Sequence, residues 1–421
     1  MSRKPASATA LAPLAASSSP EMRLLLAAID CALKGRGQDG RALPSAQDTR
    51  WVFFLTLALD HHVGGVALVG LSRLPDLVVP PLICAQLTRH ADEILKQRAD
   101  GIAELGRIVR ALGDAGIEVI PIKGPMLRQR LFGEIAAGPS RDLDLLIRPH
   151  VVTRAFDILA RSGYRGEVGF SRRQYQALLE LKGQDLLRRE DGRFVIEPHI
   201  GIMPSNLGTR IDHEAMWGRS RQGELDGVPI RVLEPEDEFL LLAVHGSKEG
   251  WARLKWLADL AALVARGPRI DWDTVARRAE MQRVRRMLGL SALLLAEIFS
   301  FEVPAAALAR RDPRLCAIAE RIIVSWDHPS DAGIFSPSSV FEFSWTRSLL
   351  CDGIAARVSY LLRTVLTPRE IHYRLVKFPD WMFPAYYLVK LTHDYLLWPI
   401  WIMLKRSGAL SHLRMWSRTK S

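Results

Sequence analysis

The sequence has few cysteines and lacks the motifs of disulfide-rich or nucleic-acid-binding proteins. Its 421 residues contain four cysteines, far apart and without a C-x-x-C pair, so neither a zinc knuckle nor a disulfide framework is indicated. Solenoid-type repeats, a helix-turn-helix, a zinc finger and aromatic RNA-binding strands are also missing. We therefore expect a protein of the reducing cytoplasm, and we do not expect nucleic acid as a partner.

The N-terminus lacks the uninterrupted apolar core of a signal peptide. Thr9, Pro13 and several serines break its apolar run, so we expect residues 1–20 to be a disordered tail. The whole chain, 48% hydrophobic and 24% charged, has a globular composition, and its length predicts two or three folded units.

Positive charge is concentrated at one end of the chain. The net charge of +11 favours anionic ligands, nucleic acid or an acidic membrane surface. From Arg347 to the end there are twelve basic and four acidic residues. The region of the candidate active site is therefore not conspicuously basic.

The C-terminal region, residues 331–421, is rich in aromatic and basic residues. Its stretch Pro384–Leu404 is long enough to suggest a membrane span, but it contains Lys390 and Asp394, and a central Lys or Asp costs roughly 2.5–3.5 kcal/mol on insertion. We reject a simple span. Two interpretations stay open: an in-plane helix in peripheral contact with a membrane, and a core helix packed onto the catalytic domain.

Apolar spacing divides the remaining chain into three regions. Residues 21–100 predict an N-terminal helical lobe, residues 101–232 a core of helices and strands, and residues 233–330 a helical domain. In the core, strands are expected over 117–122 and 142–149, each followed by a helix. The segments QDLLRRE and RFVIEPHI, separated by Asp-Gly, then predict a hairpin.

Two carboxylates at the start of the second predicted strand carry the functional hypothesis. Successive side chains of a strand alternate faces, so Asp142 and Asp144 point the same way, while Leu143 points into the core. Magnesium prefers hard oxygen ligands and usually shares one or two protein carboxylates with substrate phosphates. The pair is therefore a candidate magnesium site.

A third acid, Glu197, lies on a separate predicted strand that could pair beside the first. It is the candidate general base and third metal ligand, with Asp185 as a weaker substitute. His199, two residues later, could assist the acid or the metal, or could be a satisfied structural histidine. Pro198 between them suggests an edge strand or a bulge.

The plainer interpretation is a solvated strand end whose acids form surface salt bridges with Arg141 and Arg148, since D-x-D is common by chance. The order of features favours a site: a glycine turn follows the first strand, D-x-D begins the second, and an acid lies on a third.

Several segments together resemble an uncharacterised nucleotidyltransferase family of the polymerase-beta superfamily. The resemblance spans about Ile117 to Val264 and rests on PIKGPMLRQRLFG, SRDLDLLIRP, ILARSGYR, VIEPHIGI and HGSKEGWARLKWLADLAALV. It implies an α+β fold, with a small mixed β-sheet nucleotidyltransferase core flanked by helices and additional all-helical regions. It also implies Mg²⁺ as cofactor and transfer of a nucleotidyl group from a nucleoside triphosphate.

The first turn departs from the pattern of the wider superfamily, which carries Gly-Ser to hold the triphosphate. Here the turn is Lys123-Gly124-Pro125, and Pro125 removes one backbone donor. Gly124 could allow close backbone approach, and Lys123 and Arg141 could bind the nucleotide phosphates. The alternative is a helix-entry turn with a solvated lysine.

In the helical domain, Lys255 and Asp259 are four residues apart and could pair along one helix face. They are expected either to cap the active-site cleft or to form an ordinary ion pair in an interdomain helix, and the same alternatives hold for His245.

These observations predict a magnesium-dependent nucleotidyltransferase that acts on a nucleoside triphosphate and an unknown hydroxyl or amine acceptor. The resemblance suggests bacterial small-molecule, surface-glycan or peptide-tailoring pathways. The competing hypotheses are a nucleotide-binding module without turnover and a membrane-surface scaffold that keeps the fold.

Overall fold

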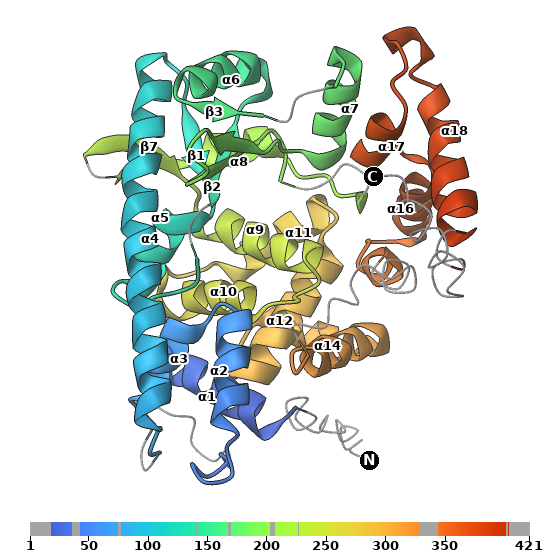
Figure 1. The fold of residues 1–421 in the computed structure, drawn as a ribbon. Coiled ribbons are helices and arrows are strands. Elements are labelled where there is room, and N and C mark those ends of the chain that lie inside the picture. Colours follow the sequence, from blue (N-terminus) through green and yellow to red (C-terminus); the bar gives the residue numbers. More distant parts are fainter. Residues whose placement is uncertain are drawn as a thin grey trace, which may run out of the picture.

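The computed structural model describes residues 18–35, 43–74, 77–139, 142–166, 170–202, 207–225, 227–328, 344–400 and 403 (Figure 1). Most of the expected tail over 1–20, together with Arg141, lies outside the described residues. Ser19 and Pro20, at the end of that stretch, already belong to the folded protein. The Ser19 side chain caps the first helix by accepting a hydrogen bond from the Met22 N–H.

The N-terminal part is helical, as predicted. It consists of α1 (Pro20–Lys34), α2 (Trp51–Asp60), α3 (Gly64–Leu71) and α4 (Pro81–Asp114). Pro81 suits the first turn of α4, where its missing N–H leaves no hydrogen bond unmade. Figure 1 shows α4 running along the molecule beside both the other N-terminal helices and the sheet.

A five-stranded mixed sheet forms the core and confirms the predicted α+β class. Its strands are β1 (Val119–Pro121), β2 (Asp142–Ile147), β3 (Tyr164–Arg165), β4 (Leu187–Arg189) and β5 (Val195–His199). They lie in the order β1-β2-β5-β4-β3, and only β2 and β5 run parallel. The connecting helices are α5 (Gly124–Phe132), η2 (Pro149–Val151), α6 (Val152–Arg161) and α7 (Arg172–Lys182).

The alternation predicted for β2 is confirmed. Leu143 and Leu145 are buried in an apolar cluster with Ile108 and Leu112 of α4. Asp144 lies on the opposite side of the strand from these residues. The hydrophobic face of β2 therefore fixes the direction in which the D-x-D carboxylates project.

The expectation that Pro198 marks an edge or bulge is wrong, because β5 lies between β2 and β4. The Pro198 carbonyl accepts a hydrogen bond from the Asp185 N–H at 3.1 Å. The antiparallel register continues beyond β4, because Gln184 forms an isolated bridge with His199, so Pro198 lies opposite Asp185. Proline has no N–H to donate to the Asp185 carbonyl, so this position keeps one of the two ladder hydrogen bonds.

A hairpin that we did not predict follows α8 (His213–Arg219). Its strands are β6 (Arg221–Leu225) and β7 (Val228–Val232), and β7 packs near β1 and α4.

The second half of the chain returns to helices. They are α9 (Pro235–Lys248), α10 (Leu254–Arg266), α11 (Trp272–Met281), α12 (Arg285–Phe299), α13 (Pro304–Ala309) and α14 (Pro313–Ser325). Their apolar faces share one cluster with the N-terminal helices, to which Leu25, Ala67, Leu260 and Leu290 all contribute. The predicted N-terminal lobe and helical domain therefore pack around a common hydrophobic core.

The C-terminal helices pack against α7 of the core. They are α16 (Ile354–Leu366), α17 (Glu370–Leu375), η5 (Asp380–Met382), α18 (Ala385–Thr392) and the π-helical turn η6 (His393–Leu397). Gln174 Nε2 donates to the Tyr386 hydroxyl at 2.7 Å, and both tyrosines, Tyr373 and Tyr386, are buried with Leu178. The C-terminal helices thus pack onto the α/β core through α7, although most of α18 itself is not buried. Among the described residues no helix has the length and apolarity needed to cross a membrane.

Candidate active site

A pocket of about 220 Å³ lies where β2 and β5 meet α5, α9 and α10. It is lined by Lys123, Gly124, Arg128, Pro139, Asp142, Asp144, Gln184, Glu197, Leu242, His245, Lys248, Glu249, Lys255, Trp256 and Asp259. The strands β2 and β5 therefore supply three of its acids, Asp142, Asp144 and Glu197, and the helical segments supply two more, Glu249 and Asp259, with most of the remaining lining.

The three predicted carboxylates line this pocket together. In the parallel pairing of β2 and β5, Asp144 lies opposite Glu197, so adjacent strands place the two side chains side by side. Asp144 is buried, whereas Asp142 is exposed. Even so, partial desolvation raises the pKa of Asp142, and the negative charge of Asp144 adds to the rise.

The Lys-Gly-Pro turn touches the start of β2. Gly124 has a φ of +76°, and a Cβ built there would lie 2.8 Å from the carbonyl oxygen of Asp142. Glycine is needed for both the left-handed conformation and the close approach of the two backbones. The backbone of Gly124 therefore makes its close approach to the backbone of β2.

Lys123 is not a solvated lysine. Its Nζ lies 2.8 Å from Asp144 Oδ1, and its side chain is 14% exposed. The residue is also the N-cap of α5, so the turn does open a helix, but without the solvated lysine that this alternative expected. The positive charge at the turn is directed at the acidic pair.

Glu197 and Asp144 differ in their protonation behaviour. Burial, with the Asp144 charge added, raises the pKa of Glu197 to about 7. Burial acts in the same direction on Asp144, but the Lys123 charge and the His199 hydrogen bond outweigh it and lower the pKa of Asp144. The pocket therefore holds one carboxylate that stays ionised and one that gains a proton near neutral pH.

His199 orients Asp144. Its Nε2 lies 2.9 Å from Asp144 Oδ1, and burial lowers the pKa of its ring, so the neutral imidazole donates its Nε2 proton to the carboxylate. Its buried Nδ1 has no hydrogen-bond partner among the described residues. The structure thus places His199 on an acid of the pocket, and its role there stays a prediction.

The donor set suits a hard divalent cation. Ligand atoms of Asp144, Glu197 and His199 all lie within 4.8 Å of one another, and Asp142 lines the same pocket without belonging to this group. Because His199 Nε2 already donates to Asp144, the carboxylate oxygens are the atoms available to an ion. Oxygen ligands of this kind fit magnesium.

The helical wall is built differently from the prediction. Asp259 pairs with Arg128, whose Nη2 lies 3.3 Å from Asp259 Oδ2, and the structure has no Lys255–Asp259 ion pair within 4.0 Å. The expected i,i+4 pair is therefore wrong, because Arg128 reaches Asp259 from α5. His245 meets Trp256 edge to face at 6.0 Å, and burial holds its pKa well below the usual value.

Arg128, Gln184 and Lys248 are among the pocket residues that the sequence analysis did not name. Gln184 Nε2 donates to Glu197 Oε2 at 2.6 Å, and Lys248 Nζ donates to Gln184 Oε1 at 3.4 Å. The predicted hairpin placed Gln184 near Glu197, and Arg128 lies one helical turn after Gly124, so both had a signal. For Lys248 the only signal in the sequence was its position one helical turn after His245.

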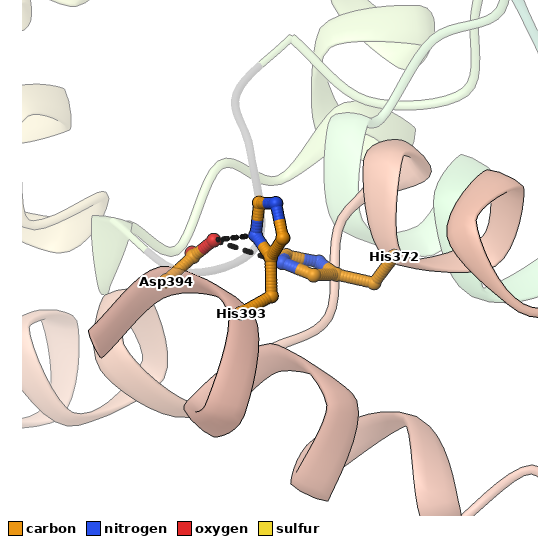
Figure 2. A group of neighbouring side chains, drawn as sticks. All are labelled: His372, His393 and Asp394. Atoms are coloured by element: carbon orange, nitrogen blue, oxygen red, sulfur yellow. Dashed lines mark hydrogen bonds and ion pairs between the residues drawn. The ribbon is translucent and has the colours of Figure 1, made fainter. Parts of the chain in front are cut away.

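A second group of possible ligands lies outside the pocket, between α17 and η6. Figure 2 shows His372 and His393 directed toward Asp394, with nitrogen to Oδ1 distances of 3.0 and 2.7 Å. Lys390 and Arg369 bind the other oxygen at 2.6 and 2.8 Å. The Arg369 backbone N–H donates to His372 Nδ1 at 2.8 Å, which leaves the ring proton on Nε2. That nitrogen is thus a donor and not a metal ligand.

Comparison with known proteins gives a family but no individual relative. No curated protein and no solved structure matches the chain. A family model described as uncharacterised nucleotidyltransferase matches residues 47–300, a range that contains every residue of the pocket and extends beyond the predicted span on both sides. The chain therefore belongs to this uncharacterised nucleotidyltransferase family.

Proposed function

We propose that the protein is a magnesium-dependent nucleotidyltransferase that transfers a nucleoside monophosphate from a nucleoside triphosphate to a hydroxyl or amine acceptor. The observation that carries this proposal is the gathering of Asp142, Asp144 and Glu197 around one pocket. Membership of a nucleotidyltransferase family supports the reaction class.

In this proposal the acids and the lysines of the pocket have different roles. Asp142 and Asp144, with Glu197, would hold magnesium, which when bound neutralises phosphate charge and orients the reacting oxygens. Lys123 supplies a point charge beside them for a substrate phosphate. Lys248 and Lys255 line the same pocket and face the negative charge of the leaving pyrophosphate.

Glu197 is the proposed general base. A carboxylate can accept the proton of an attacking hydroxyl or amine, and the hydrogen bond from Gln184 fixes one of the Glu197 oxygens. The acceptor oxygen or nitrogen would lose its proton to Glu197 while bonding to the α-phosphorus. The bond between that phosphorus and the bridging oxygen breaks, and pyrophosphate leaves.

Replacement of Asp142 tests the proposal. The Asp142→Asn variant removes an exposed carboxylate, so we expect the fold to persist, and Asp157→Asn on α6 is a matched exposed control outside the pocket. Each protein is incubated with magnesium, α-phosphate-labelled nucleoside triphosphates and a cell extract. We expect the wild type and the control to transfer label and release pyrophosphate, and Asp142→Asn to do neither. Equal label transfer by all three proteins would refute the assignment.

A second candidate is a nucleotide-binding module without turnover. The turn favours it, because Pro125 offers no N–H to a phosphate and Lys123 is paired with Asp144. Magnesium-dependent nucleotide binding without pyrophosphate release, in the presence of extract, would support this alternative.

A further inference from the structure

The C-terminal helices expose a large apolar surface. On α16 the side chains of Ile354, Val358 and Leu362 are 79%, 49% and 55% exposed, and their spacing of four residues places them along one face. The side chains of Ala356 and Tyr360 are buried instead. One face of α16 is therefore an apolar stripe that points away from the rest of the protein.

The neighbouring α18 and η6 continue this surface. Leu388 and Leu391 are 68% and 37% exposed, Tyr395 is 52% exposed, and Trp381 just before α18 is 78% exposed. Figure 1 shows α16, α17 and α18 together on the side of the molecule beyond α7, and α18 contacts both α16 and α17. We call the exposed apolar residues of α16, α18 and η6, with Trp381, the C-terminal face.

Interactions inside the region hold this face outward. Tyr373 and Tyr386 pack toward α7, and Asp394 binds Lys390 of α18 and Arg369 next to α17. The inner side of the helices is therefore occupied by specific partners. The apolar residues of the C-terminal face lie on the other side of these helices and do not pack on the rest of the protein.

The acids of the described C-terminal region all have protein partners. Asp352 accepts hydrogen bonds from the Arg285 and Arg286 backbone N–H groups, and Glu370 pairs with Lys182 at 3.0 Å. Asp380 accepts a hydrogen bond from the Ser171 hydroxyl, and Asp394 lies among the bases already described. The negative charge of the region is thus directed toward the protein.

Bases outnumber acids in this region, seven to four over residues 344–400. Its exposed bases are Arg363, Arg369, Arg374 and Lys377, of which Arg369 pairs with Asp394 at 2.8 Å and Arg374 with Glu370 at 2.9 Å. After Asp394 the sequence contains five further basic residues and no acid. The C-terminal face therefore combines apolar side chains, tryptophan and tyrosine with a net positive charge.

We propose that the C-terminal face docks the protein on an anionic lipid surface. Apolar and aromatic side chains would enter the boundary between head groups and acyl chains, and the bases would contact lipid phosphates and carboxylates. A second copy of the chain would bring the same positive charge to this face, so charge complementarity favours the lipid. This property is separate from nucleotidyl transfer.

Vesicle co-sedimentation of the full chain tests the proposal. Vesicles of phosphatidylcholine alone are compared with vesicles that also contain phosphatidylserine, at low and high salt. The test variant carries Ile354→Asp and Leu388→Asp, and the control carries Val52→Asp and Leu82→Asp, which are 76% and 70% exposed on α2 and α4. We expect wild type and control to bind the anionic vesicles, more weakly at high salt, and the test variant to bind at least about tenfold more weakly.

Absence of wild-type binding to anionic vesicles would overturn the proposal, as would equal binding by the test and control variants. A concentration-dependent dimer that only the test variant disrupts, without vesicle binding, would assign the face to a second copy. Label transfer in the nucleotidyltransferase assay without vesicles should be equal in all three proteins, so failure of one proposal is distinguishable from failure of the other.

Discussion

Among the residues that the structure describes, two clusters bring carboxylate and histidine ligands within 4.8 Å of one another, but their surroundings differ. In the pocket, Asp144 and Glu197 bring two carboxylates together with His199. Among the described residues, Lys123 is the only lysine or arginine with a nitrogen within 4.0 Å of these carboxylates. Around Asp394, by contrast, Lys390 and Arg369 already bind the single carboxylate, and two histidines donate to it.

The difference shows that ligand proximity alone does not make a metal site. In the pocket, burial raises the pKa of Glu197 and the neighbouring Asp144 charge adds to the rise, so a divalent cation would offset negative charge there. At Asp394 burial also acts to raise the pKa, but the hydrogen bonds from His372 and Lys390 outweigh it and lower the pKa. A further cation there would meet positive charge, so we expect the first cluster to act chemically and the second to hold helices together.

The largest expected effect comes from removing the proposed base. Glu197→Gln keeps the size of the side chain but cannot accept a proton, so we expect nucleotidyl transfer to fall roughly 10²–10⁴-fold. Label transfer from α-phosphate-labelled triphosphates measures the change. The companion variant His372→Gln should keep wild-type activity. A Glu197→Gln enzyme as active as the wild type would contradict the role of Glu197 as general base.

His61 extends the comparison to a buried histidine whose ring nitrogens bind backbone groups and no carboxylate. His61 Nε2 lies 2.8 Å from the Trp326 carbonyl, and Nδ1 accepts from the Leu254 N–H, so the ring must stay neutral. Burial lowers its pKa to about 4, whereas the unfolded chain takes up this proton below about 6.5. Its stabilising contribution is therefore complete above pH 6.5 and is lost as the pH falls toward 4, by about 3 kcal/mol in total.

Urea unfolding at pH 7 and pH 4 measures this effect. The difference in unfolding free energy between the two pH values should shrink by about 3 kcal/mol in His61→Gln, because glutamine does not titrate. An unchanged difference would show that His61 titrates alike in the folded and unfolded chain.

The smallest expected effect concerns the second cluster. Asp394→Asn removes the charge that neutralises the buried Lys390, so we expect a loss of about 1.5–3 kcal/mol in unfolding free energy. Nucleotidyl transfer should be unchanged at a temperature where the variant is folded. Loss of activity without loss of stability would instead assign the second cluster a chemical role.

The sequence predicted what depends on local pattern. Alternation in β2 predicted the direction of Asp142 and Asp144, and the hairpin pattern placed Glu197 on a neighbouring strand. The unpredicted β6–β7 hairpin carries mostly polar residues in its first strand, which hides the strand pattern although Asp-Gly marks its turn.

What the sequence could not predict depends on contacts between distant segments. Arg128, Lys248 and Lys255 come from three different helices, so no local count of charge reveals that they line one pocket. The Asp259 partner was mispredicted for the same reason, since Arg128 is 131 residues away in the chain. The shared core of the N-terminal helices and α10–α12 likewise rests on long-range packing.

Manganese binding, followed by electron paramagnetic resonance in the presence of a nucleoside triphosphate, tests most directly whether the pocket carboxylates share a divalent cation. We expect wild type and Asp394→Asn to bind the ion equally well, and Asp142→Asn and Glu197→Gln to bind it at least about tenfold more weakly. Undiminished binding in both pocket variants, or loss of binding in Asp394→Asn alone, would contradict the assignment of the metal site to Asp142, Asp144 and Glu197.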